Sequence, residues 1–153
     1  MKSLLLWSLV VLLSPGIKAQ SAARKTADPN PQAHNPLIGA WKLVSLEDFG
    51  ANAQVRQIDC AGMFVFTADG KAAVQLMYRN AQSGSAYAKG GYEASFGSYR
   101  LGKSSTFTFH IEGALVRRLI GKDLSRAYEI SGKHLTVKST DANEHWRVIW
   151  ERY

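Results

Sequence analysis

The segment LIGAWKLVSLED, from Leu37 to Asp48, decides how the folded part of the chain begins. Apolar and polar residues alternate along it, as they do in a β-strand that buries one face. Gly39 and Trp41 stand near its start and are separated by one residue. If the alternation holds throughout, one face of this strand carries Trp41, Leu43, Ser45 and Glu47.

The chain after Pro36 contains no proline and has the pattern of short strands joined by turns. The clearest signal is a hairpin over 62–79, in which Ala68-Asp69-Gly70 supplies the turn because Asp-Gly suits positive φ. Further strands are expected at 38–47, 54–58, 92–101, 105–112, 124–130, 135–139 and 145–152, with a short helical turn within 113–123.

Antiparallel strands that follow one another this closely form either a sandwich or a closed up-and-down barrel. Local connections favour the barrel, and closure also removes the exposed edges that would pair with other chains. We therefore expect an all-β fold over residues 37–153, a single antiparallel up-and-down β-barrel of about eight strands.

The N-terminal segment has the features of a secretory signal peptide over residues 1–19. Lys2 precedes an apolar run over 3–14, and IKA (17–19) offers a cleavage site after Pro15 and Gly16. The run is shorter than the about 20 residues that span a bilayer as a helix, although an uncleaved anchor is the alternative. We expect a secreted or periplasmic protein with no stable membrane span after cleavage, and a disordered, proline-rich leader over 20–36.

Charge and cysteine content exclude some classes of protein. The chain has 19 basic and 12 acidic residues, and the excess is spread along it rather than gathered in a basic stripe, which argues against nucleic acid as a partner. The single cysteine, Cys60, allows no internal disulfide and is interpreted as a small structural residue.

No sequence motif indicates a metal or a cofactor. His110, His134 and His145 are not spaced as metal-ligand pairs, and one cysteine provides no zinc set. The chain contains neither a P-loop nor a G-x-S-x-G motif. We therefore expect no metal and no cofactor, and we assign no catalytic residue.

The Gly39-x-Trp41 motif on a first strand resembles the signature of the lipocalins and the wider calycin group. The chain is most similar to the bacterial and fungal lipocalin-like domain family. The resemblance continues through GMFVFTADGKAAVQLM (62–77), FGSYRL (96–101), FHIEGAL (109–115), SRAYEISGKHLTV (125–137) and WRVIWER (146–152). It departs from classical secreted lipocalins, which usually carry disulfides and a C-terminal helix.

The resemblance implies structural roles for three residues. Gly39 would permit a close approach at the closed end of the barrel, and Trp41 would plug that end with its ring. A basic side chain from the last strand would lie over the indole as a cation–π contact. Arg147 and Arg152 are the candidates, and Arg152 is preferred because it shares a face with Trp146, Val148 and Trp150.

A barrel of this size has room for one small ligand. The polar residues expected to bind it are Glu47, Tyr99, His110, Arg126 and Tyr128. Glu47 and Arg126 are expected to pair inside the barrel, or else to lie at its rim or surface. Tyr99 and Tyr128 would otherwise be ordinary core residues, and His110 would face solvent if Phe107, Phe109 and Ile111 face the core.

Three functions remain open from the sequence. The first is an exported protein that binds a small, largely apolar molecule in its cavity. The second, suggested by the resemblance, is a cyclase or isomerase that uses Glu47 or His110 as its acid–base group, and it requires these two residues to converge in one cavity. The third is a filled barrel that binds a partner through its loops.

Overall fold

The computed structural model describes residues 35–50, 54–80 and 85–153. The expected signal peptide and all but the last two residues of the expected leader lie outside these ranges. The strands are β1 (Gly39–Phe49), β2 (Val55–Ile58), β3 (Cys60–Phe66), β4 (Lys71–Tyr78), β5 (Tyr92–Leu101), β6 (Thr106–Ala114), β7 (Asp123–Ser131), β8 (His134–Ser139) and β9 (Trp146–Arg152). A 3₁₀ turn, η2 (Arg117–Leu119), lies within the segment predicted to contain a helical turn.

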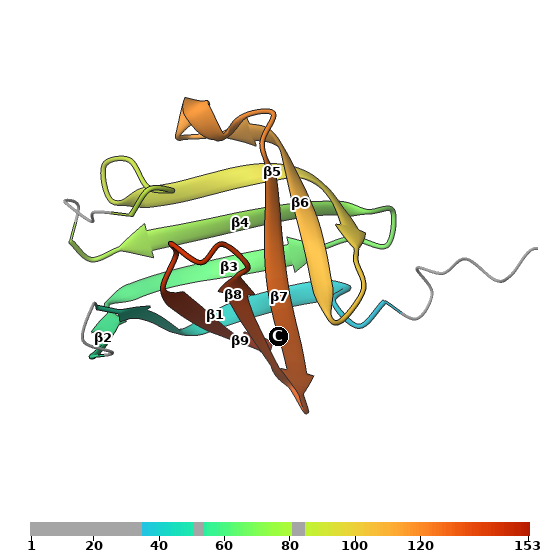
Figure 1. The fold of residues 1–153 in the computed structure, drawn as a ribbon, viewed down its shortest axis with the longest axis horizontal. Coiled ribbons are helices and arrows are strands. Elements are labelled where there is room, and N and C mark those ends of the chain that lie inside the picture. The colour runs from blue at the N-terminus through green and yellow to red at the C-terminus, as the bar shows by residue number, and fades with distance from the viewer. Residues whose placement is uncertain (1–34, 51–53, 81–84) are drawn as a thin grey trace, which may run out of the picture.

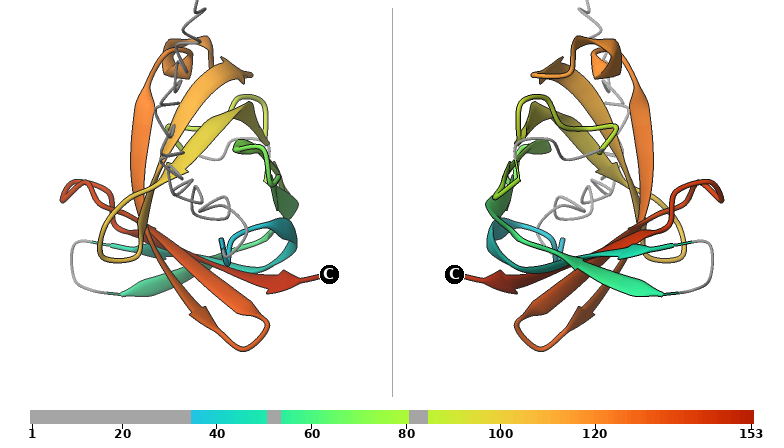
Figure 2. Two further views of the ribbon diagram at one scale, coloured as in Figure 1. Left: turned by 90° about the vertical axis from the view of Figure 1, so that its right-hand side faces the viewer. Right: turned by 90° about the vertical axis from the view of Figure 1, so that its left-hand side faces the viewer.

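The strands form a closed antiparallel barrel, which confirms the predicted fold (Figure 1). Each strand from β3 to β9 pairs with the next along the chain, and β1 closes the ring by pairing with both β3 and β9. The short strand β2 pairs with the second half of β1 and lengthens the wall there. Figure 2 looks along the long axis of the molecule and shows the strands curving around one another.

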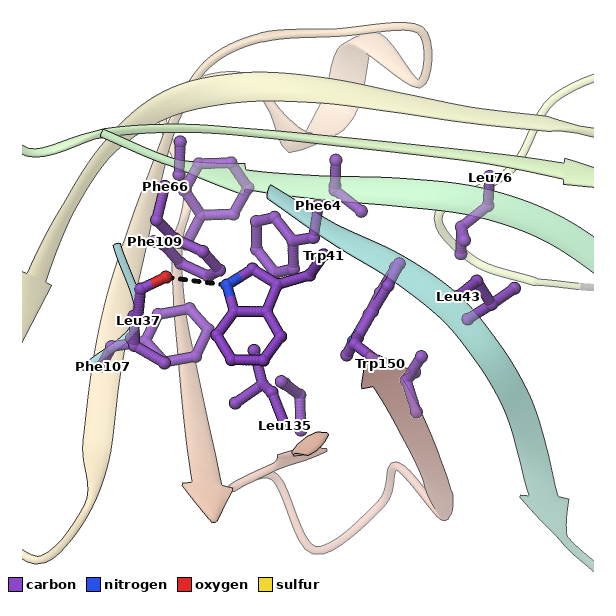
Figure 3. Close-up of a cluster of buried hydrophobic side chains, with 14 of the residues drawn as sticks. Leu37, Trp41, Leu43, Phe64, Phe66, Leu76, Phe107, Phe109, Leu135 and Trp150 are labelled. Carbon is purple, nitrogen blue, oxygen red and sulfur yellow. Dashed lines mark hydrogen bonds between the residues drawn. The ribbon is translucent and has the colours of Figure 1, made fainter. Parts of the chain in front are cut away.

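Trp41 fills the closed end of the barrel. Its side chain is fully buried, and its indole N–H donates a hydrogen bond to the carbonyl of Leu37 at 2.8 Å. Phe66 and Phe107 are also almost completely buried, and their rings meet edge to face at 5.4 Å (Figure 3). Packing of this kind adds to the free energy gained from burying the rings.

Arg152 lies over the outer side of this plug. Its guanidinium carbon is 4.2 Å from the centre of the Trp41 ring, and its Nη1 and Nη2 groups donate to the carbonyls of Ile38 and Pro36. The expected cation–π contact therefore comes from Arg152. Arg147, the other candidate, lies over the ring of Phe49.

Gly39 is required where Arg152 crosses the chain. Its φ of +136° is one that side chains rarely adopt, and a Cβ at this position would lie 2.5 Å from Nη1 of Arg152. The close approach that the resemblance implied for Gly39 is thus an approach to the arginine itself.

Asn35, which precedes the expected start of the domain at Leu37, packs against the barrel. Asn35 is buried, donates a hydrogen bond to the Tyr99 hydroxyl at 2.7 Å, and accepts one from the amide of Leu37 at 3.0 Å. Sequence composition missed this because Asn35 lies in a polar, proline-rich segment, whereas its partner Tyr99 is distant in the chain.

A β-bulge at Val44 breaks the alternation of β1. The pairing of β1 with β9 shifts register between Leu43 and Ser45, so Val44 is an extra residue and is half exposed. Trp41 and Leu43 face inward before the bulge, and Leu46 is the next buried residue after it. The prediction that Glu47 shares a face with Trp41 is therefore wrong, because the bulge reverses the faces of the residues that follow it.

We predict that Gly39→Ala and Arg152→Ala are coupled. Gly39→Ala should lower the free energy of unfolding by about 1–3 kcal/mol, because it strains the backbone and displaces the guanidinium from Trp41. In an Arg152→Ala background the same change should cost less, since the displaced group is already absent. Urea unfolding of the four proteins measures the coupling. Gly132→Ala, at a positive φ with open space around it, should be additive with Arg152→Ala; additive costs at Gly39 would contradict the proposed contact.

Asn35→Ala should lower the free energy of unfolding by about 1–3 kcal/mol, because it removes two buried hydrogen bonds. Gln75→Ala, which shortens an exposed amide on β4, should change it by less than about 0.5 kcal/mol. Thermal and urea unfolding measure both variants, and equal stability of the two would place Asn35 outside the cooperative domain.

Candidate functional site

A cavity of about 390 Å³ lies inside the barrel. Its inner wall is apolar and consists mainly of Phe64, Val74, Leu76, Phe109, Val137 and Trp150. Arg56 on β2 and Asn143 and His145 before β9 also line it, which places its mouth at the end of the barrel opposite Trp41. The cavity is therefore open at one end, while Trp41 fills the opposite end of the barrel without lining the cavity itself.

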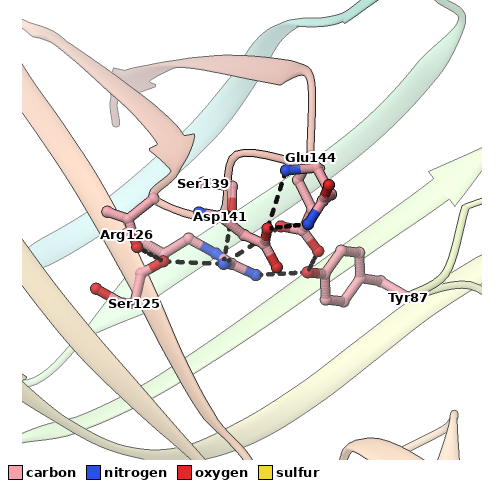
Figure 4. A network of polar contacts seen from close by, with 8 residues as sticks. Tyr87, Ser125, Arg126, Ser139, Asp141 and Glu144 are labelled. Atoms are coloured by element: carbon pink, nitrogen blue, oxygen red, sulfur yellow. Dashed lines mark hydrogen bonds and ion pairs between the residues drawn. The ribbon is translucent and has the colours of Figure 1, made fainter.

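Arg126 on β7 is the centre of a polar cluster on one side of the mouth (Figure 4). Its guanidinium donates to the Tyr87 hydroxyl at 2.9 Å, to the Ser139 hydroxyl at 3.3 Å and to the carbonyl of Ser125 at 3.0 Å. It also lies over the rings of Tyr87 and Trp146, at 5.4 and 5.0 Å from their centres. These contacts compensate for burying a charged side chain.

Glu144 balances the charge of Arg126. Its Oε2 lies 3.6 Å from Nη1 of Arg126, and its Oε1 accepts a hydrogen bond from Tyr87. Burial and this hydrogen bond raise the pKa of Tyr87 to about 12, so the phenol stays protonated near neutral pH. Among the described residues, Oε2 of Glu144 and the indole N–H groups of Trp146 and Trp150 are buried without a hydrogen-bond partner.

Glu93 on β5 is a second acidic group in the cavity wall. Its carboxylate accepts a hydrogen bond from the Tyr78 hydroxyl at 3.3 Å. Burial raises the pKa of Glu93 to about 7, against the lowering effects of the Tyr78 hydrogen bond and the charge of Arg126. Glu93 therefore changes its charge near neutral pH.

Cys60 lies close to this wall but has the properties of a structural thiol. Burial, followed by the charges of Asp59 and Glu93, raises its pKa to about 11. A thiol with this pKa is protonated at neutral pH and is a weak nucleophile. Its Sγ lies 3.6 Å from the carbonyl of Ile58.

Of the five predicted ligand-binding residues, only Arg126 lines the cavity. Glu47 lies on the outer side of the wall and forms an ion pair with Arg147, with Nε of Arg147 at 2.8 Å. The expected pairing of Glu47 with Arg126 is therefore wrong, because the bulge at Val44 turns the Glu47 side chain to the outer side of the wall. Glu144, in the turn between β8 and β9, takes the place that Glu47 was expected to occupy.

The other three residues also lie away from the cavity. Tyr99 is buried near the closed end, where its hydroxyl donates to the carbonyl of Thr67 and its ring packs on Phe66. Tyr128 packs against the core near Phe107. His110 lies on the outer side with its Nδ1 2.7 Å from Asp123, because Phe107, Phe109 and Ile111 occupy the inner side of β6.

Sequence reasoning missed most polar residues of the cavity, among them Tyr78, Tyr87, Glu93 and Glu144. Tyr78 could have been found by alternation, since it shares the inner face of β4 with Val74 and Leu76. Glu93 could have been found by alternation, since Ser95 and Tyr99 on the same strand face inward with it. Tyr87 and Glu144 lie between strands, where periodicity does not predict direction.

Within the described residues, no group of three or more His, Cys, Asp or Glu side chains is placed to hold a metal ion. The same part of the chain contains no helix that is long and apolar enough to cross a membrane.

The lipocalin-like domain family matches the chain over residues 38–153. Two solved structures are similar to it: a lipocalin-like protein from Bacteroides uniformis (15% identity, TM-score 0.49) and an uncharacterized protein from Bacteroides eggerthii (15% identity, TM-score 0.48). Each alignment covers 76% of this chain and 98% or 99% of the other. No curated protein matches the chain. The match over almost the entire barrel shows that the chain belongs to the lipocalin-like domain family.

Proposed function

We propose that this protein is exported and binds one small, largely apolar molecule in its barrel cavity. The observation that carries the proposal is a cavity of about 390 Å³ with an apolar inner wall and with polar groups near its mouth. Binding sites for small molecules usually combine a mainly apolar pocket of about 300–1,000 Å³ with a few oriented polar groups.

Affinity would come mainly from removing apolar surface from water, at about 25 cal/mol per Å². Phe64, Phe109 and Trp150, whose rings contact one another through Phe64, provide much of this surface. The polar groups near Arg126 and Glu93 would orient the ligand with its polar end toward the mouth.

The two alternative functions have less support. A filled barrel that acts only through its loops does not account for the cavity. A cyclase or isomerase that uses Glu47 and His110 requires both side chains in the cavity, and neither lines it. Export rests on the sequence of residues 1–19, which lie outside the described residues.

The neutral fluorescent probe Nile red should bind saturably, with one site per chain. Ser95→Phe should weaken this binding at least about tenfold, because Ser95 is buried in the cavity wall and a phenyl ring would fill the space. Ala94→Phe, one residue along β5 on the opposite face, is the matched control and should bind like the unmodified protein. Titration with fluorescence detection measures all three, and thermal unfolding checks that both variants fold.

Secretion from a bacterial host should yield a protein that begins at Gln20, because signal peptidase cleaves after small residues such as Ala19. Leu12→Arg, which interrupts the apolar run, should retain the full N-terminus and remain with the cells. Intact-mass analysis of the purified proteins distinguishes the two forms. A full-length N-terminus in the unmodified exported protein would contradict the proposed processing.

A further inference from the structure

The acidic residues that line the cavity outnumber the Lys and Arg residues that line it by one. Asp48 and Arg56 form an ion pair at the rim, with a distance of 2.7 Å between oxygen and nitrogen. Arg126 and Glu144 form the second pair, on the polar side of the mouth. Among the described residues, no basic group lies within ion-pair distance of Glu93, so its carboxylate is the charge left over.

Arg126 is poorly placed to receive an anionic ligand. Its charge is paired with Glu144, its faces contact Tyr87 and Trp146, and three of its five N–H groups donate to Tyr87, Ser125 and Ser139. A carboxylate ligand would have to displace Glu144 and would enter a cavity that also contains Glu93. The unpartnered N–H groups of Trp146 and Trp150 are neutral and leave this charge count unchanged.

We propose that the cavity selects an apolar amine, with the hydrocarbon part among the inner aromatic residues and the cationic ammonium group beside Glu93. This inference rests on the proposed binding function and specifies the chemical class of the ligand. An ammonium group would supply the missing positive charge and would donate hydrogen bonds to a carboxylate that already accepts one from Tyr78. Opposite charges attract more strongly in a partly buried site than in water.

Several charged or titratable groups act on Glu93 from the surrounding elements. Tyr78 on β4 contacts it directly, Arg126 on β7 and Glu144 before β9 act through their charges, and Cys60 on β3 lies near enough for its thiol to be affected by Glu93. Tyr78 and Cys60 have pKa values raised above their usual range, so both stay neutral near pH 7. Of Tyr78, Cys60 and Glu93, it is Glu93 whose pKa, about 7, lies at neutral pH. His145 and the pair formed by Asp48 and Arg56 line the same cavity.

A pH dependence follows from this assignment. An alkylamine has a pKa near that of lysine, about 10.4, and remains cationic between pH 5.5 and 8.5. Glu93 loses its proton over the same interval and becomes the anion that the ammonium group needs. The affinity for the amine should therefore rise with pH, whereas the affinity for a neutral alcohol should not.

Three ligands with the same eight-carbon chain test the proposal by displacement of Nile red: octylamine, 1-octanol and octanoate. At pH 8.5 octylamine should bind about tenfold more tightly than 1-octanol, and octanoate should bind most weakly. Lowering the pH to 5.5 should remove most of the advantage of octylamine. Octanoate binding best, or octylamine binding no better than 1-octanol at pH 8.5, would overturn the proposal while leaving cavity binding intact.

Two substitutions in the cavity and one control outside it separate the roles of the carboxylates. Glu93→Gln should remove both the preference for octylamine and its pH dependence, while binding of 1-octanol is retained. Glu112→Gln makes the same change on the outer side of β6, where Glu112 pairs with Lys71, and should leave the order of the ligands unchanged. Glu144→Gln should improve octanoate binding, because it frees the charge of Arg126.

The variants also separate this inference from the function on which it rests. Loss of Nile red binding in the unmodified protein would overturn the proposed function, and the amine preference with it. Retention of the amine preference in Glu93→Gln would overturn only the assignment to Glu93. Thermal unfolding of each variant with and without octylamine provides a second readout, since a ligand that binds the native state raises the melting temperature.

Discussion

The contact between Arg152 and Trp41 is the constraint on which the closed end of the barrel depends. It joins the last strand to the first, and the same guanidinium holds the carbonyls of Pro36 and Ile38. A barrel closes only if its first and last strands meet in the correct register. The arginine can reach the indole because Gly39 leaves the space for it.

The bulge at Val44 divides β1 into two parts with different roles. Before it, Trp41 and Leu43 face the sealed end. After it, Leu46 and Asp48 face the open cavity, while Glu47 lies outside beside Arg147. One extra residue thus decides which carboxylates belong to the site, and it leaves Arg126 to pair with Glu144.

The sequence predicts most of the barrel because its signals are local. Alternation located the strands on both sides of the Asp69-Gly70 turn, and the Gly39-x-Trp41 motif together with Arg152 predicted the sealed end. The site was less predictable, because it depends on contacts between distant segments and on the register of pairing. Nothing near Val44 marks the bulge, and the directions of Tyr87 and Glu144 in the connections between strands follow from the closed fold. Asn35 shows the same limit, since its burial depends on Tyr99.

The contacts of Arg126 also bear on the rates at which a ligand enters and leaves the cavity. Tyr87 belongs to the connection between β4 and β5, Glu144 to the turn between β8 and β9, and Arg126 fastens both to β7. These segments border the mouth of the cavity. The mouth can therefore widen only if the contacts among Arg126, Tyr87 and Glu144 break together, and not by the movement of one loop alone. The residence time of a bound ligand therefore depends on the strength of the contacts that Arg126 makes with Tyr87 and Glu144. It does so independently of how well the ligand packs against the apolar inner wall.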